Sequence, residues 1–278
     1  MENDKWNDPG TKKTFSFNEE GKLVDSEGNG PQKGFKNDDR FGDWLHSYVV
    51  KQMISMGLKT INVPEEGGAP IYFTHNAFNQ PEKLLVLICG SGRIMAGLWS
   101  VGVCAYHGLS NGSVLPFLSD ASSRGFEVVI LNPNHHGYKA ITTKYGTNIG
   151  MVKHTLFAFE NLIIPSNPQK ISIVCHSMGG ECTCAVAKRW PQWFSEHITA
   201  IAMTDACESK FGELEGIDMN EFMHKICINW ICSDEPINSL LSQNGRASVH
   251  RSAGTTDHPL STGKAYPYIW EFFDSMNQ

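Results

Sequence analysis

No apolar run in this sequence is long enough to cross a membrane, since the longest, such as Leu84–Cys89, are far shorter than a spanning helix. The opening residues, MENDKWNDPGTKK, contain no apolar core of the kind found in a secretory signal. We therefore expect a protein of the cytoplasm or the nucleus, with no signal peptide and no membrane segment.

The sequence also has no excess of basic residues. Its 23 Lys and Arg residues face 29 Asp and Glu residues, which gives a formal net charge of −6. A basic stripe is the usual mark of a surface that binds RNA or DNA, so no direct nucleic-acid binding is expected. Any role in RNA or chromatin biology would act through protein partners.

The eight cysteines form no regular framework, which argues against a disulfide-bonded secreted protein. Cys182 and Cys184 lie two positions apart in a predicted helix, where they do not share a face, so they do not predict a metal pair. No metal ion is expected. Four other cysteines are expected to be small buried hydrophobic residues in or just after strands: Cys89, Cys175, Cys207 and Cys232.

Apolar runs that predict strands alternate with helical segments along the 278 residues. Such a pattern is typical of a parallel sheet covered on both faces. We predict one α/β-hydrolase-like domain with a mostly parallel central sheet over residues 37–278, after an N-terminal extension (1–36) with a short hairpin in Thr14–Leu23. The predicted strands are 70–74, 84–89, 127–132, 171–175, 198–203, 226–232 and 247–252. The first predicted helix begins at Asp38 or Asp39 and ends at Gly57, and the last begins near Tyr268. Between them, helices are predicted over 114–122, 149–164, 179–190 and 220–225.

The most informative segment is Ile171–Gly180, ISIVCHSMGG, in which a buried strand runs into a turn of small residues and then a helix. This is the context of the α/β-hydrolase nucleophile turn, which is strained and needs small neighbours. Gly179 meets that need, while Cys175 stands where glycine is usual. The turn predicts Ser177 as the nucleophile and the N–H of Met178 as an oxyanion donor. A tight turn with an inert serine is the plainer alternative.

A second glycine-containing turn follows the predicted strand Leu84–Cys89. In α/β-hydrolases the loop after this strand supplies the other oxyanion-hole N–H, so Ser91 or Gly92 is the predicted donor. A phosphate-binding loop is the rival interpretation. The segment lacks the third glycine of a dinucleotide fingerprint and no G-K-[ST] follows, so no cofactor is expected.

The catalytic order expected along an α/β-hydrolase chain is serine, acid, histidine. His258 is the predicted base, because it lies in a loop between the last strand and the last helix. Two places are open for the acid: Asp205 ends one predicted strand, and Asp234 with Glu235 follows the next. Either carboxylate can reach the far ring nitrogen of the histidine, and spacing alone leaves the choice open.

Three further histidines lie near these turns. His176 adjoins Ser177 but is expected to point away from the turn, in a structural role. His135 and His136 follow a predicted strand and are expected to line the rim of the pocket. No other ligands cluster near these two residues, so they do not predict a metal site.

Several segments together resemble the Argonaute-binding-protein-two (Arb2) domain family, over nearly the whole chain from about Phe15 to Phe273. The family includes animal cotranscriptional regulators and the fission-yeast Argonaute siRNA chaperone subunit. The segments that carry the resemblance are FxFNxxGxL (15–23), LLVLIxGSG (84–92), AGxW (96–99), VILNPN (129–134), HSxGG (176–180), AIAxTD (200–205), NW (229–230), EP (235–236) and SAGTxxH (252–258).

This resemblance implies an α/β-hydrolase-like fold with Ser177 as nucleophile and His258 as base, and its T-D segment favours Asp205 as the acid. Two functions follow as hypotheses. The first is a serine hydrolase of an ester, thioester or amide. The second is a non-catalytic scaffold or cotranscriptional regulator in small-RNA silencing, heterochromatin or splicing control, with Argonaute or chromatin and splicing proteins as partners.

The chain departs from the animal members of this family at two places. Cys89 stands where they have histidine, which leaves the backbone of the following G-S-G turn intact. The retention-like tail of some vertebrate members is missing, so a location in the endoplasmic reticulum is not expected.

Overall fold

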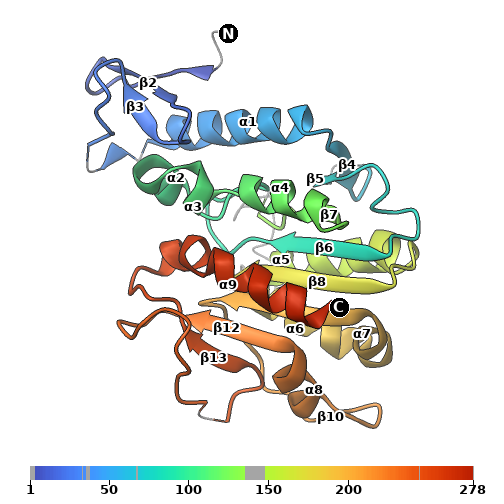
Figure 1. The fold of residues 1–278 in the computed structure, drawn as a ribbon. Helices are drawn as coiled ribbons and strands as arrows, with labels where there is room; N and C mark the ends of the chain where they lie inside the picture. Colours follow the sequence, from blue (N-terminus) through green and yellow to red (C-terminus); the bar gives the residue numbers. More distant parts are fainter. Residues whose placement is uncertain are drawn as a thin grey trace.

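The computed structural model describes residues 4–32, 34–35, 38–66, 68–134, 148–243 and 245–277. An eight-stranded sheet runs through its centre in the order β13-β12-β9-β8-β6-β7-β5-β4 (Figure 1). The strands from β13 to β7 are parallel, whereas β5 pairs antiparallel with both β7 and β4. Their bounds are β4 (Lys59–Val63), β5 (Ala69–Phe73), β6 (Lys83–Ile88), β7 (Glu127–Ile130), β8 (Lys170–His176), β9 (Ile198–Thr204), β12 (Cys227–Ile231) and β13 (Val249–Ser252).

This strand order is that of the α/β-hydrolase fold. Counted along the chain, the strands of the sheet take the order 1-2-4-3-5-6-7-8, with the second strand reversed. The predicted, mostly parallel α/β sheet is therefore confirmed. The order brings the carboxyl ends of β6, β8, β9 and β12 to one edge of the sheet, where open α/β folds bind their ligands.

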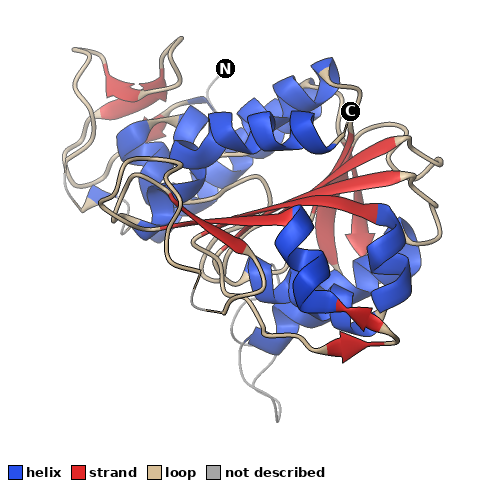
Figure 2. Cartoon of the chain, turned by 60° about the horizontal axis from the view of Figure 1, so that its bottom comes forward, coloured by secondary structure: helices blue, strands red, loops and turns tan. Residues whose placement is uncertain are grey.

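Helices cover both faces of the sheet (Figure 2), and each face has its own apolar core. Along β6, Leu85 and Leu87 enter one core, whereas Leu84, Val86 and Ile88 enter the other. Because successive strand residues point to opposite faces and both faces are buried, the strand is apolar throughout. The first core receives α1 (Asp39–Ser55), α2 (Val101–His107), α3 (Leu109–Gly112), α4 (Leu115–Ser123) and α9 (Ser261–Met276); the second receives α5 (Asn148–Ala158), η3 (Phe159–Ile163), α6 (Gly179–Arg189), α7 (Pro191–His197) and α8 (Met219–Ile226).

The first helix has the predicted ends, and the last helix does not. Asp38 accepts a hydrogen bond from an N–H in the first turn of α1, and Gly57 adopts a φ of +92° just after its end. By contrast, α9 begins at Ser261 rather than near Tyr268, and Pro267 lies inside it. Burial of one apolar face of α9 outweighs the local preference of proline to end a helix.

A three-stranded antiparallel sheet precedes the main sheet and lies beside α1 (Figure 1). It consists of β1 (Trp6–Asn7) and a hairpin of β2 (Thr14–Phe17) and β3 (Leu23–Asp25). Phe17 stacks on Trp44 of α1, with the ring centroids 6.0 Å apart. Aromatic packing of this kind attaches the extension to the main domain. A second small hairpin, β10 (Glu213–Leu214) and β11 (Ile217–Asp218), lies between β9 and α8.

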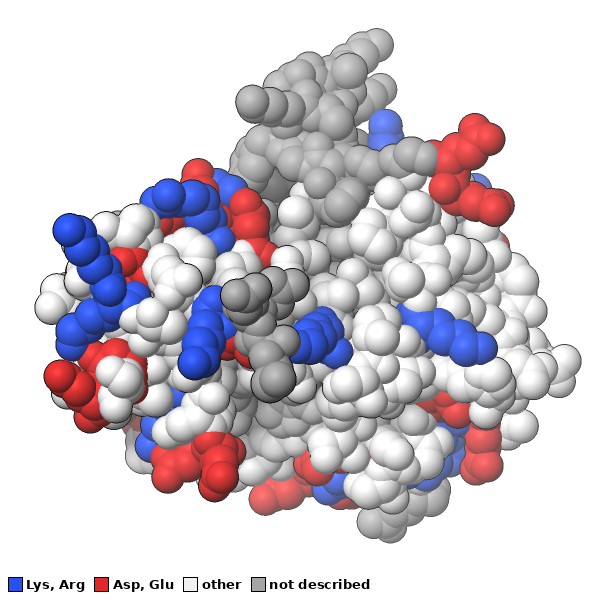
Figure 3. Space-filling view, turned by 90° about the horizontal axis from the view of Figure 1, so that it is seen from above, with Lys and Arg blue, Asp and Glu red and all other residues white. Residues whose placement is uncertain are grey.

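The surface seen in Figure 3 carries both charge signs, with Lys and Arg side chains interspersed among Asp and Glu. The described residues of this face therefore form no single basic area of the kind that phosphate backbones require. Across the described part of the chain, no helix is both long enough and apolar enough to span a bilayer.

The cysteines follow the expectation only in part. Cys89 and Cys175 are buried, but Cys232 is half-buried and Cys207 is exposed. The prediction for Cys207 was wrong because the chain leaves the sheet before this residue, when β9 ends at Thr204. Cys182 and Cys184 are both buried in the second core.

Candidate active site

The turn between β8 and α6 holds Ser177 in a left-handed backbone conformation, with φ at +53°. A residue other than glycine rarely adopts this conformation, and strain of this kind is a mark of the nucleophile turn. The turn is tied to the end of the next strand: the Ser177 N–H donates to the Thr204 carbonyl (3.2 Å), and the Ser177 carbonyl accepts from the Cys207 N–H (2.9 Å). The hydroxyl-bearing residue is therefore lifted above the sheet at its carboxyl edge.

Two glycines let the backbone pack closely around Ser177. A Cβ at Gly179 would lie 2.6 Å from the Ile88 carbonyl oxygen, and a Cβ at Gly90 would lie 2.8 Å from the Ser177 Cβ. Neither position has room for a side chain, which explains the small residues in both sequence segments. The contact also places the turn after β6 directly against the turn that carries Ser177.

The turn after β6 is held by side-chain amides from the segment that follows β7. Asn134 Nδ2 donates to the Gly90 carbonyl (2.7 Å) and to the Ile94 carbonyl (2.9 Å), and Asn132 Oδ1 accepts from the Ala96 N–H (3.0 Å). Both asparagines belong to the VILNPN segment, but nothing in the sequence alone assigns them this role. The sequence signal that was available is the pair of asparagines at the end of a predicted strand.

The predicted oxyanion donors lie in the two turns that meet at Ser177. Met178 is the N-cap residue of α6, and Ser91 with Gly92 follows the glycine that contacts Ser177. Within the described ranges, no hydrogen bond occupies the N–H of Met178, Ser91 or Gly92. These groups, together with the helix N-terminus, can stabilise negative charge that develops next to the Ser177 hydroxyl.

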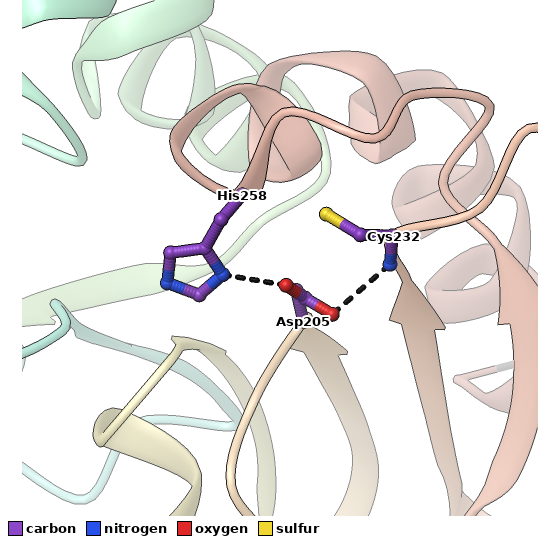
Figure 4. Close-up of side chains that lie close together, drawn as sticks. All are labelled: Asp205, Cys232 and His258. Carbon is purple, nitrogen blue, oxygen red and sulfur yellow. Dashed lines mark hydrogen bonds and ion pairs between the residues drawn. The ribbon is translucent and has the colours of Figure 1, made fainter.

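His258, the predicted base, and Asp205, one of the predicted acids, are bonded to each other (Figure 4). His258 Nδ1 lies 2.5 Å from one Asp205 carboxylate oxygen, and the Cys232 N–H donates to the other oxygen at 3.0 Å. Asp205 also has a left-handed φ of +44°. Of the alternative acids, Asp234 and Glu235 are exposed, and neither contacts His258 in the part of the chain that the structure covers.

The Asp205 carboxylate is stabilised in its ionised form. Burial alone raises its pKa, but the hydrogen bonds from the Cys232 N–H and from His258 outweigh burial and hold the pKa below its usual value. An ionised acceptor requires His258 Nδ1 to carry the proton. The other ring nitrogen, Nε2, is then left as an acceptor, which is the tautomer that a general base needs.

His176 connects the base to the nucleophile turn. Its ring centroid lies 4.6 Å from that of His258, and its Nδ1 lies 2.9 Å from the Thr204 carbonyl oxygen. We expected His176 to point away from the turn in a structural role; its ring is buried and bonded to the backbone, as such a role requires, but it also lies against His258. Burial, with a contribution from the neighbouring His258, lowers the His176 pKa to about 4, so this ring is neutral at pH 7.

The Ser177 hydroxyl itself donates to no described residue, so its hydrogen bond to His258 is not formed here. Catalytic hydrogen bonds are commonly long or misaligned before substrate binds. The His258 side chain is 45% exposed and begins the short turn η4 (His258–Leu260), so it is less constrained than Ser177. His135 and His136, predicted to line the pocket rim, lie outside the described residues.

A buried asparagine holds the turn that carries the acid. Asn229 Oδ1 accepts from the Ala206 N–H (3.2 Å), and its Nδ2 donates to the Ala206 carbonyl (3.0 Å). The Asp205 N–H donates to the Trp230 carbonyl at 2.8 Å. The NW segment quoted in the resemblance therefore positions Asp205, a role that spacing along the chain does not reveal.

Two residues of this site, together with Cys232, could hold a metal ion. Asp205, Cys232 and His258 each offer one ligand atom, and these atoms all lie within 4.8 Å of one another. Burial, followed by the Asp205 carboxylate, raises the Cys232 pKa to about 12, so the thiol keeps its proton when no metal is bound.

This chain is similar to known proteins over most of its length. The family described as the Arb2 domain matches residues 33–149 and 139–237. "Cotranscriptional regulator ARB2A" of Mus musculus is 24% identical over 300 residues, which cover 87% of this chain and 72% of that protein.

Two solved structures share the fold. "Structure of the histone deacetylase Clr3" matches with a TM-score of 0.61 at 12% identity; the match covers 90% of this chain but 41% of that chain. "A histone deacetylase from Saccharomyces cerevisiae" matches with a TM-score of 0.57 at 10% identity, over 88% of this chain and 99% of that chain. At such identities the likeness establishes the fold alone.

Proposed function

This chain belongs to the Arb2 domain family, and we propose that it is a serine hydrolase that cleaves a carboxylic ester, thioester or amide. The observation that carries the proposal is the acid–base pair of His258 and Asp205, 2.5 Å apart, beside a left-handed Ser177 turn. Ser177 and Asp205 both have a strained, left-handed backbone, and the His258 imidazole is half-exposed. These three residues come from different segments and lie at the edge of the sheet where catalysis occurs in this fold.

The reaction follows from the groups present. His258 Nε2 takes the proton of the Ser177 hydroxyl as the oxygen attacks the substrate carbonyl carbon. The tetrahedral oxyanion accepts hydrogen bonds from the N–H groups of Met178 and Ser91, while Asp205 stabilises the imidazolium. The imidazolium then protonates the leaving group, and water cleaves the acyl-enzyme by the same steps in reverse.

A fluorophosphonate probe tests this proposal, because it reacts preferentially with activated serine hydroxyls. We expect the intact mass of the wild-type chain to rise by one phosphonyl group, located on Ser177 by peptide mapping. Ser177→Ala should abolish the adduct, whereas Ser233→Ala, at a serine after β12 on the same sheet edge, should leave it unchanged. A folded wild-type protein that forms no adduct at Ser177 would falsify the proposal.

A second function is favoured by the name of a relative. The mouse protein is named a cotranscriptional regulator, and we propose that this chain acts in the nucleus or cytoplasm in small-RNA silencing, heterochromatin or splicing control through protein partners. Complementation separates the two functions: in cells that lack the protein, rescue of regulation by Ser177→Ala at normal abundance would show a scaffold. Loss of rescue would tie regulation to hydrolysis.

A further inference from the structure

The Cys232 thiol lies beside the pair of His258 and Asp205, so that a sulfur atom stands next to an imidazole nitrogen and a carboxylate oxygen. Its sulfur points toward the Asp205 carboxylate, which already bonds His258 (Figure 4). The three side chains come from the end of β9, the end of β12 and the start of η4, and their ligand atoms lie within 4.8 Å of one another. The proposed hydrolysis uses Asp205 and His258, but it gives the thiol no role.

This set of ligands matches a particular class of metal ion. One imidazole nitrogen, one thiolate sulfur and one carboxylate oxygen are the ligands that zinc prefers, whereas magnesium and calcium favour oxygen alone. Atoms bound to zinc at about 2.0–2.3 Å lie about 3.3–3.8 Å apart around a tetrahedron. The three ligand atoms, all within 4.8 Å of one another, are close to this spacing, and water would complete the tetrahedron as the fourth ligand.

We propose that Asp205, Cys232 and His258 form a zinc-binding site whose occupation inhibits the enzyme. The inhibitory part rests on the proposed hydrolase function. Zinc takes the place of the hydrogen bond between His258 Nδ1 and Asp205, the imidazole proton moves to Nε2, and the Cys232 thiol proton passes to solvent. With Nε2 protonated, His258 cannot accept the proton of Ser177, and the nucleophile is not activated.

The exposure of the ligand side chains decides whether an ion can reach them. The side chains of His258 and Asp205 are 45% and 21% exposed, so a hydrated ion reaches them from solvent. In this proposal the metal-free pair of His258 and Asp205 is the active state, and the zinc-bound pair is the inhibited state.

The test uses the purified full chain in a phosphine reductant, which does not bind zinc as thiols do. Zinc affinity is measured by competition with a chromophoric chelator, and Co²⁺ serves as a spectroscopic probe. We expect one zinc ion per chain, a thiolate-to-cobalt charge-transfer band, and slower fluorophosphonate labelling with zinc but not with magnesium. Cys232→Ala should weaken zinc binding at least about tenfold and remove the band.

Two further variants sharpen the test. Cys207→Ala removes the exposed cysteine of the same sheet edge and should keep the wild-type zinc affinity. If Cys232→Ala does not fold, Cys232→Ser preserves the shape of the side chain and should show the same loss of zinc affinity. Labelling rates with zinc are compared with the metal-free rate of the same variant.

The outcomes separate this proposal from the hydrolase function. Zinc binding that is unchanged in both Cys232 variants, the absence of the cobalt band, or acceleration by zinc would each overturn the inhibitory site. Zinc binding that depends on Cys232 in a protein that never labels at Ser177 would keep the site and remove the hydrolase. Labelling at Ser177 with no zinc binding would do the opposite.

Discussion

The turns that carry Ser177 and Asp205 adopt the same unusual backbone, with φ at +53° and +44°, yet they are held in different ways. Besides its backbone hydrogen bonds to Thr204 and Cys207, the Ser177 turn depends on close packing, which Gly90 and Gly179 permit. The Asp205 turn is fixed by hydrogen bonds, chiefly from Asn229 and from the peptide groups of β12.

The left-handed backbone is thus stabilised in two different ways within one site. Close packing tolerates no added atom but requires no particular polar partner. Hydrogen bonding tolerates changes of shape but fails when one partner is lost. Substitutions at the Ser177 turn should therefore damage the fold first, and substitutions at the Asp205 turn should damage the chemistry first.

The largest effect is expected from Asp205→Asn. The amide keeps the size of the carboxylate, but it cannot stabilise the imidazolium and favours the wrong tautomer of His258. We expect fluorophosphonate labelling of Ser177 to slow by about 10³–10⁴-fold, with little change in the urea midpoint. Asp234→Asn, at an exposed acid near the same edge, is the control and should label normally; equal slowing in both variants would contradict the assignment.

Gly90→Ala tests the packed turn. The added Cβ would lie 2.8 Å from the Ser177 Cβ, so one of the two turns must move. We expect the free energy of unfolding, measured with urea, to fall by about 2–4 kcal/mol. Gly212→Ala, where a Cβ meets nothing within 4 Å, should cost less than about 1 kcal/mol. Two variants of equal stability would show that close packing does not hold the turn.

His176 links the two turns and gives the fold a pH dependence. Its folded pKa of about 4 lies below the unfolded value near 6.5, so the unfolded chain binds a proton that the folded chain does not. The stabilisation is present above about pH 6.5 and is lost as pH falls toward 4. Between pH 7 and pH 5 the loss is about 2 kcal/mol.

His176→Asn removes the titrating ring while retaining a donor for the Thr204 carbonyl. The difference in unfolding free energy between wild type and this variant, measured at pH 7 and at pH 5, isolates the histidine from other titrating groups. A difference that does not change with pH would mean that His176 is not kept neutral by burial.

The smallest effect is expected at Asn229, for which the chain offers a matched control. Asn220 makes the same pair of hydrogen bonds, to the N–H and carbonyl of Phe211, away from the site. Replacing either asparagine with alanine should cost about 1–2 kcal/mol of unfolding free energy. Only Asn229→Ala should also slow labelling of Ser177; identical labelling in both variants would count against a positioning role.

The fold and the nucleophile turn could be predicted from the sequence because their signals are local. Apolar strand residues, followed by Ser177 and Gly179, describe both the buried strand and the tight turn after it. Which carboxylate pairs with His258 could not be predicted from spacing, because it depends on which neighbouring turn reaches the histidine across the sheet. The ring contact of His176 and the approach of Cys232 are likewise set by tertiary packing, which sequence distance does not report.

The most direct test of the catalytic unit is a crystal structure of the fluorophosphonate adduct. We predict a phosphorus atom bonded to the Ser177 oxygen, with a phosphonyl oxygen about 2.7–3.1 Å from the N–H groups of Met178 and Ser91. His258 should face the modified serine while still bonded to Asp205. An adduct whose phosphonyl oxygen points to solvent, with His258 turned away, would contradict the account.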